Sequence, residues 1–471
     1  MTLRMALRAF ATQPVRSAVL AFGFGVGIAC MAGLLGVGEV ILEQSRSPHL
    51  RGGGDLVIYG ESGKLSSARF VTSQLLRAAP LTDRATTASP SLDADLYIFD
   101  GGRSPLRVEA RGGIPSLERA LGDPETSTVV AWRDTTADRS WASPDPASVL
   151  RAMDRFHPIP DVPARSDSWA EWLYFNGRAG ENRFYLSFIV GPRTSPGRRR
   201  AGVRLQLERD GRMTSYVDDG EISEPLLLSE APDITIGANR VQLDGMRYRI
   251  TLSLYPQDGG RRNATAVVTG QLALNAPIGK SLPPFEIGGA GGWVSGYVVP
   301  VLTGELTGRL DVEGRVVSLD GGVGYHDHNW GFWEGVTWQW GQVAGDGLSL
   351  LYGKIRPPAD AADPQRVPAF LIALGQDGPL GFTTDVTIDE LDDPSSGQPQ
   401  GIVVTGRGEA LSLNMTLAVR GTTSTSLGGW FGDGRRGEFV QLRARYHVTG
   451  SVRTRQIDFT ADGTAETFRG N

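Results

Sequence analysis

Hydrophobic and polar residues alternate along most of the chain after residue 165, in short runs separated by glycine-rich turns. Alternation with a period of two is typical of antiparallel strands, and Asp210-Gly211 is typical of a hairpin turn. The runs form two series, before and after Gly304, and we expect each to close into a barrel because closure removes exposed strand edges. The sequence therefore predicts a mainly β protein with two tandem antiparallel barrels, over residues 165–305 and 306–471. The clearest predicted strands are 183–190, 203–207, 248–254, 266–272, 308–312, 348–352, 370–374, 415–419, 440–446 and 455–459.

The beginning of the chain has a different pattern. Residues 17–38 form an uncharged apolar run, which is long enough for one transmembrane helix of about 20 residues. Three arginines precede this run, and positive charge stays on the cytoplasmic side of a membrane. A cleaved signal peptide is the weaker alternative, because its apolar region has only about 7–15 residues. We therefore predict a single-pass N-terminal anchor over residues 1–45 and an extracytoplasmic location for the rest of the chain.

Residues 46–164 combine short apolar runs with turn residues. This pattern predicts a small extracytoplasmic α/β or β module. Its last part, residues 156–163, contains three prolines that exclude helix, so we expect an extended connector into the first barrel. His157 lies in this connector and is expected to be a surface or capping residue.

Composition and the absence of certain motifs exclude several classes of function. The net charge of −5 provides no positive field that would recruit nucleic acid. The only cysteine, Cys30, lies in the apolar N-terminal run, so we expect neither an internal disulfide nor a cysteine-based metal site. Gly279-Lys280-Ser281 is not a phosphate-binding loop, because Leu274 replaces the glycine required five residues earlier. The Gly-x-Ser-x-Gly elbow of serine hydrolases does not occur in the sequence.

Aromatic residues and histidines are most concentrated between Trp293 and Trp340. The centre of this segment is the run of residues 325–330, which combines Tyr, His, Asp, Asn and Trp. In a strand, alternate side chains of this run point to opposite faces. One face then has Tyr325, Asp327 and Asn329, and the other has His326, His328 and Trp330.

Three hypotheses explain this cluster. The first is Brønsted-acid catalysis, because an Asp327 carboxyl that faces an aromatic cavity is desolvated, has a raised pKa and can protonate an alkene. Aromatic faces would then stabilise the carbocation. The second is a metal site, because His-x-His on a strand chelates a metal with one further ligand, for which the candidates are His157, Glu171, Glu334 and His447. The third is structural, with buried histidines and Asn satisfying backbone groups.

Two motifs resemble a known protein family. Residues 324–331, Gly-Tyr-His-Asp-His-Asn-Trp-Gly, are similar to the signature of the carotenoid 1,2-hydratase (hydroxyneurosporene synthase) and AttH-like lipocalin family. Residues 171–175 resemble the Glu-Trp-Trp-Tyr-Phe motif of its N-terminal domain, with Leu173 in place of the second Trp, and residues 292–300 resemble the approach to the signature. The resemblance covers residues 165–470 and implies two lipocalin-like barrels with an apolar cavity near their junction.

The resemblance also implies a reaction. Enzymes of that family add water to a terminal isoprenoid double bond without a cofactor, and the acid of their signature corresponds to Asp327, with Tyr325 beside it. We therefore expect the chain to bind a long apolar molecule, isoprenoid or lipid, and to act as a hydratase with Asp327 and Tyr325 as catalytic residues and with no metal or cofactor. The expected substrate-binding residues are Glu171, Trp172, Trp293, Tyr297, His326, His328, Trp330, Trp338 and Trp340.

The N-terminal segment resembles a different family. Residues 6–8, residues 13–17 and the glycine-rich run after them are similar to the first helix of an FtsX/MacB-type ABC-transporter permease. The other membrane helices of that family are absent from the sequence, so this resemblance implies at most an ABC-exporter partner. The alternative function is therefore a non-catalytic lipid carrier or chaperone that works with an ABC exporter at the periplasmic face of the bacterial inner membrane.

Overall fold

The computed structural model describes residues 15, 53–59, 65, 67–77, 85–99, 105–124, 126, 129–257, 266–426 and 438–469. Apart from Val15, the predicted anchor over residues 1–45 lies outside these residues, as does Cys30. No helix within the described ranges is both long enough and apolar enough to cross a membrane. The chain divides into two compact units, one within residues 1–65 and 87–142 and the other within residues 66–86 and 143–471.

The first unit contains a β-hairpin and short helices. Arg111 on the second strand of the hairpin donates hydrogen bonds to the carboxylates of Glu118 and Asp123, at 3.1 and 2.8 Å. These bonds connect the hairpin to the helical segment that follows it. The elements are β1 (Ser91–Ile98), β2 (Leu106–Gly113), α4 (Pro115–Ala120) and α5 (Thr136–Ala142).

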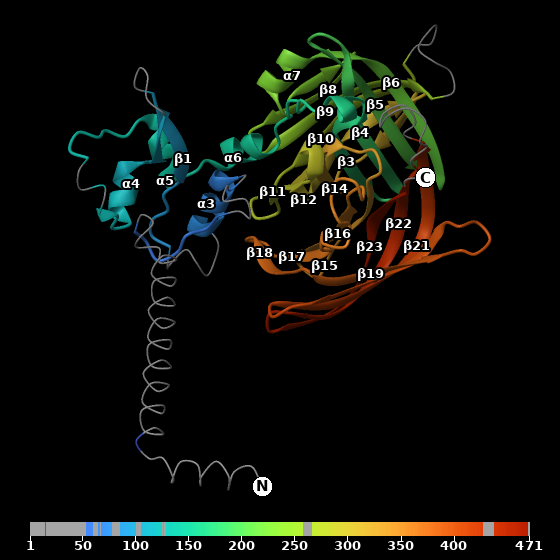
Figure 1. Ribbon diagram of the computed structural model, residues 1–471. Helices are drawn as coiled ribbons and strands as arrows, with labels where there is room; N and C mark the ends of the chain where they lie inside the picture. Colours follow the sequence, from blue (N-terminus) through green and yellow to red (C-terminus); the bar gives the residue numbers. More distant parts are fainter. Residues whose placement is uncertain are drawn as a thin grey trace. The chain divides into compact units, whose positions relative to one another are not determined.

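The second unit consists mainly of two antiparallel barrels, as the alternating pattern predicts (Figure 1). The first barrel is a closed ring of eight strands, because its first and last strands also pair with each other. Their order is β10 (Val268–Asn275), β12 (Val294–Val312), β14 (Gly322–Phe332), β3 (Trp169–Ala179), β4 (Asn182–Ser195), β5 (Arg198–Arg209), β6 (Arg212–Ser223) and β9 (Arg247–Pro256).

Shorter elements surround this ring. Two strands, β11 (Leu282–Gly288) and β13 (Arg315–Ser318), pair with β12. Two others, β8 (Asn239–Asp244) and then β7 (Ile234–Ile236), extend the sheet from β9. The helices are α3 (Ala68–Arg77), α6 (Pro146–Met153) and α7 (Glu224–Glu230), with 3₁₀ helices η3 (Pro163–Ser168) and η4 (Ala290–Gly292).

The second barrel is a nearly closed sheet of nine strands. Its interior is filled by buried side chains, among them Leu350, Tyr352, Leu442 and Tyr446. The strand order is β18 (Pro379–Thr383), β17 (Phe370–Leu374), β16 (Leu348–Arg356), β15 (Thr337–Gly345), β23 (Arg455–Arg469), β22 (Glu438–Val452), β21 (Leu411–Ser426), β20 (Pro399–Arg407) and β19 (Asp385–Asp392).

The division between the barrels differs from the expected one. The predicted boundary at residues 305 and 306 falls inside β12, whose register with β14 shifts between Val301 and Gly304. A Cβ on Gly304 would lie 2.1 Å from the carbonyl oxygen of Asn275, so this glycine permits a close strand contact and does not end the strand. The signature strand β14 pairs with β12 and β3 and therefore belongs to the first barrel, not to the second.

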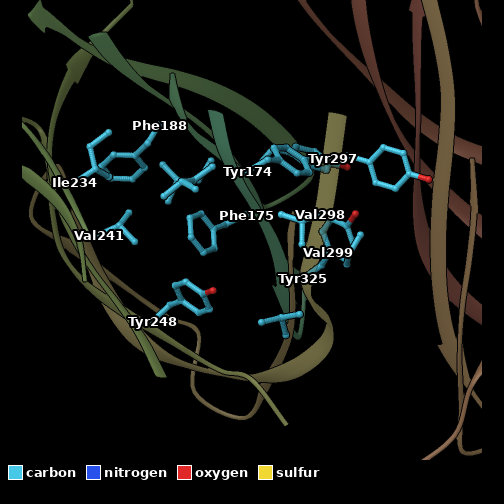
Figure 2. Close-up of a cluster of buried hydrophobic side chains, with 14 of the residues drawn as sticks. Tyr174, Phe175, Phe188, Ile234, Val241, Tyr248, Tyr297, Val298, Val299 and Tyr325 are labelled. Atoms are coloured by element: carbon cyan, nitrogen blue, oxygen red, sulfur yellow. The ribbon is translucent and has the colours of Figure 1, made fainter. Parts of the chain in front are cut away.

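β3 and β14 are buried on both of their faces. Figure 2 shows Phe175 and Tyr248 inside the first barrel, where they belong to its hydrophobic core. On the opposite face of β3, the ring of Tyr174 meets Phe439 of β22, and Asn176 accepts a hydrogen bond from Gln342 of β15 at 3.1 Å. The outer wall of the first barrel therefore packs against the second barrel along these strands.

Close packing between β15 and β16 leads to a first prediction, which concerns stability. A Cβ on Gly353 would lie 2.4 Å from the ring of Trp340 and 2.8 Å from that of Phe370. We expect Gly353→Ala to lower the free energy of unfolding by about 1–3 kcal/mol, because the added methyl group overpacks this site. Urea denaturation measures the change. Gly220→Ala is the control, because a Cβ there meets no atom within 4 Å, and equal stability of the two variants would contradict the prediction.

Candidate active site

The outward face of the signature strand opens on a pocket where the two barrels meet. The pocket's free volume is about 40 Å³, which is enough for about one water molecule. A ligand larger than water therefore enters only when the aromatic side chains of the wall move apart. The aromatic wall is Trp172, Tyr174, Trp333, Trp338, Trp340 and Phe439, and the carboxyl groups are those of Asp327 and Glu466.

Asp327 is held in this pocket by hydrogen bonds to both of its oxygens. The residue is buried, with 3% of its surface exposed. The Tyr325 hydroxyl donates to Oδ2 at 2.6 Å, and the Asn329 amide donates to Oδ1 at 2.7 Å. Trp340 Nε1 donates to the Tyr325 oxygen at 2.8 Å, which directs the hydroxyl hydrogen toward Asp327. The shared face of Tyr325, Asp327 and Asn329 is the one that the period of two predicts.

A second carboxyl group, which no sequence motif indicates, lies in the same pocket. Glu466 on β23 stands opposite Trp340 in the pairing of β23 with β15. Burial and the negative charge of Asp327 raise the pKa of Glu466 to about 8, against the hydrogen bond from Tyr174. Burial also raises the pKa of Asp327 to about 6, although the hydrogen bond from Tyr325 lowers it in part.

The hydrogen bond from Tyr325 leads to a second prediction, which concerns the pKa of Asp327. We expect Tyr325→Phe to raise the pKa of Asp327 above about 6, because the hydroxyl stabilises the ionised carboxylate. A carboxyl titration followed by ¹³C NMR, compared with the wild type, measures this shift. The exposed Tyr97→Phe is the control and should leave the titration unchanged. An unchanged pKa of Asp327 in Tyr325→Phe would mean that the hydroxyl does not act on the carboxylate.

The opposite face of the signature strand has a buried network of charges. The two histidine rings share Asp154, with His326 Nε2 and His328 Nδ1 at 3.1 and 2.8 Å from its oxygens. His328 Nε2 also lies 3.1 Å from Glu171 Oε1, and His326 Nδ1 lies 2.9 Å from the Tyr174 carbonyl oxygen. Asp154 is the C-cap of α6, so the end of this helix supplies the central carboxylate.

This network holds its charges in a stable arrangement. Burial opposes a charge on His328, but hydrogen bonds with Asp154 and Glu171 outweigh burial and raise its pKa to about 9. Burial likewise opposes ionisation of Asp154 and Glu171, but the neighbouring histidines outweigh it and lower both pKa values. The fully buried Arg199 adds a further positive charge, with Nη1 4.0 Å from Glu171 Oε2. Only one contact of this network, from His326 Nδ1 to the Tyr174 carbonyl oxygen, satisfies a backbone group as the structural hypothesis expects.

The metal hypothesis meets only part of its expected geometry. Among the described residues, ligand atoms of His157, Glu171 and His328 lie within 4.8 Å of one another. His326, the other half of the His-x-His motif, turns to Asp154 instead. Glu171 Oε1 contacts His157 Nδ1 at 2.7 Å and His328 Nε2 at 3.1 Å, so the three side chains already form a hydrogen-bonded group. The expectation that no metal is used stays a prediction.

Several of the expected substrate-binding residues lie away from the pocket. His326, His328 and Glu171 belong to the charge network on the opposite face. Trp330 stacks on His157, with ring centroids 4.1 Å apart. Trp293 is buried and donates from Nε1 to the Phe332 carbonyl oxygen at 2.9 Å, and Tyr297 packs edge-on against Trp340. The expected residues that line the pocket are Trp172, Asp327, Trp338 and Trp340.

Comparisons with known proteins find similarity in structure only. No protein-family model and no curated protein sequence matches the chain. A Nitrosomonas europaea protein assigned as AttH has 15% identity and a TM-score of 0.43, over 66% of this chain and 99% of that chain. Kievitone hydratase from Nectria haematococca has 14% identity and a TM-score of 0.42, over 66% and 93%. CghA has 12% identity and a TM-score of 0.42, over 64% and 88%. The resemblance in function therefore rests on the sequence motifs and on the site.

Proposed function

We propose that the pocket between the barrels binds the unsaturated end of an apolar molecule and adds water to its double bond. The observation that carries this proposal is Asp327, a carboxyl group buried among aromatic rings with its pKa raised toward neutrality. General acids and bases work best when their pKa lies near the working pH. A carboxyl with this pKa in an aromatic pocket supports proton transfer to and from a weakly basic alkene.

The pocket walls suit the cation that such a reaction forms. Protonation of an alkene leaves a carbocation, and the electron-rich faces of Trp and Tyr rings attract positive charge. Trp338 and Trp340 of β15 and Tyr174 of β3 lie around Asp327 in this role. Water that enters beside the alkene when the wall moves apart is the nucleophile that captures the cation. No cofactor is needed, because hydration changes no oxidation state overall.

The substrate class follows from the apolar wall and from the resemblance of residues 324–331 to the carotenoid 1,2-hydratase signature. A polyene with a terminal isoprenoid double bond, such as neurosporene, fits both. A single membrane anchor over residues 1–45, at the periplasmic face of a bacterial inner membrane, would bring the pocket within reach of substrates dissolved in the bilayer. The resemblance of the anchor to a permease helix adds an ABC exporter as a proposed partner.

Product analysis tests this function. The purified full chain is incubated with neurosporene, and extracts are analysed by liquid chromatography and mass spectrometry. We expect a product that has gained one water molecule. Binding of the polyene, measured by quenching of Trp fluorescence, with complete return of unchanged polyene would favour the alternative of a lipid carrier. Failure of both binding and conversion across a panel of polyenes and lipids would contradict the proposal.

A further inference from the structure

Glu466 has the contacts of a neutral carboxylic acid. The residue is 6% exposed, and its Oε1 has no hydrogen-bond partner within the described part of the chain. The Tyr174 hydroxyl is the hydrogen-bonding group that acts on this carboxyl. A buried carboxylate with an unpaired oxygen is costly, because its charge loses its water without replacement. A protonated carboxyl group avoids most of this cost.

Asp327 has the contacts of a carboxylate. Both of its oxygens accept hydrogen bonds, from Tyr325 and from Asn329. His328, on the other face of β14, has its pKa raised to about 9, and its positive charge favours the ionised form of Asp327. Two negative charges in one buried pocket repel each other. Asp327 and Glu466 therefore share one proton, and these contacts favour its residence on Glu466.

We propose that Glu466 is the acid that protonates the bound alkene and that Asp327 is the base that deprotonates the attacking water, an assignment that rests on the proposed hydratase function. As the Glu466 O–H bond breaks, a C–H bond forms and leaves a carbocation. The water oxygen then bonds to the cationic carbon, and one water proton passes to Asp327. Return of that proton to Glu466, through water in the shared pocket, restores the starting state. The acid role that the sequence analysis gave to Asp327 thus moves to Glu466.

The ionisable groups around Glu466 come from several strands. Burial and Asp327 raise the pKa of Glu466 to about 8, above the value of about 6 for Asp327. At neutral pH, Glu466 then holds a proton and Asp327 is ionised, so turnover should be highest between about pH 6 and 8. The groups that interact with the Glu466 charge are Asp327 and Tyr325 on β14, Tyr174 on β3, Tyr185 on β4, Tyr352 on β16 and Tyr446 on β22.

Infrared difference spectroscopy of the purified full chain tests the assignment without any substrate. At pH 7 we expect the C=O stretch of a protonated carboxyl group, and this band should disappear as the pH rises through about 8. The band should be absent from Glu466→Gln and present in Asp327→Asn. The exposed Glu409→Gln is the control and should keep the wild-type band. A band that is lost from Asp327→Asn and retained in Glu466→Gln would overturn the assignment.

Turnover provides the second readout. We expect Glu466→Gln to hydrate neurosporene about 100-fold more slowly or worse, the usual effect of losing a general acid, with polyene binding unchanged. Wild-type turnover in Glu466→Gln would overturn the role of Glu466 and leave the hydratase function standing. A wild-type chain that hydrates no polyene would instead end the hydratase function, while the infrared result would still report where the shared proton lies.

Discussion

Replacing Asp327 by Asn is expected to lower the turnover of a hydrated polyene by about 100- to 10,000-fold, the range for removal of a general acid or base. The amide has the shape of the carboxyl group and accepts a hydrogen bond from Tyr325, but it neither donates nor accepts a proton at neutral pH. Polyene binding should persist, because the aromatic wall is unchanged. Steady-state kinetics and Trp-fluorescence titration measure the two effects separately. Wild-type turnover in this variant would exclude Asp327 from the reaction.

The same variant is expected to be more stable than the wild type at neutral pH. Because burial raises the pKa of Asp327 from 3.8 to about 6, the folded wild type resists ionisation and loses stability as the pH rises between these values. Asn has no such penalty, so the difference in melting temperature should grow from pH 4 to pH 7. Asp458→Asn, at an exposed carboxyl group, is the control and should show no such trend.

The second large effect is expected at His328, in the charge network. His328→Gln should lower the free energy of unfolding by about 3–5 kcal/mol, because it leaves the buried carboxylates of Asp154 and Glu171 without the cation between them. Urea denaturation at pH 7 measures this loss. His447→Gln is the matched control, since that ring is largely exposed and pairs with Asp458 at the surface.

The stability of the wild type should also depend on pH through His328. Its pKa is raised from 6.5 to about 9 in the folded chain, so its contribution is complete below pH 6.5 and disappears as the pH rises through about 9. The Gln variant should lack this alkaline loss. Equal stability of His328→Gln and wild type, or an alkaline loss that persists in the variant, would show that the network does not hold the first barrel together.

The alternating pattern predicted the fold class well, because burial on one face of a strand is a local property that the sequence displays directly. It predicted two antiparallel barrels and placed Tyr325, Asp327 and Asn329 on one face, and the structure confirms both. It failed at Gly304, where a glycine needed for a close contact with Asn275 has the same sequence pattern as a glycine in a turn.

Partners from distant segments were not predictable. Asp154 lies 172 residues before His326, and nothing in the sequence near a helix end indicates that its carboxylate enters a barrel. Glu466 reaches the pocket only because β23 pairs with β15, and the last predicted strand, 455–459, ends before this residue. Three consecutive arginines, 198–200, follow a Ser-Pro-Gly turn, a pattern typical of a solvated hairpin tip. In the structure, Arg199 is instead fully buried beside Glu171.

The most direct test of acid-catalysed hydration in the pocket is a labelling measurement in D₂O. The full chain converts neurosporene in D₂O, and the product is returned to H₂O before mass spectrometry, so that only carbon-bound deuterium remains. We expect a product with one added water and one carbon-bound deuterium, because the exchangeable proton of a pocket carboxyl group passes to the alkene carbon. A hydrated product without carbon-bound deuterium, or deuterium gain without added water, would contradict it.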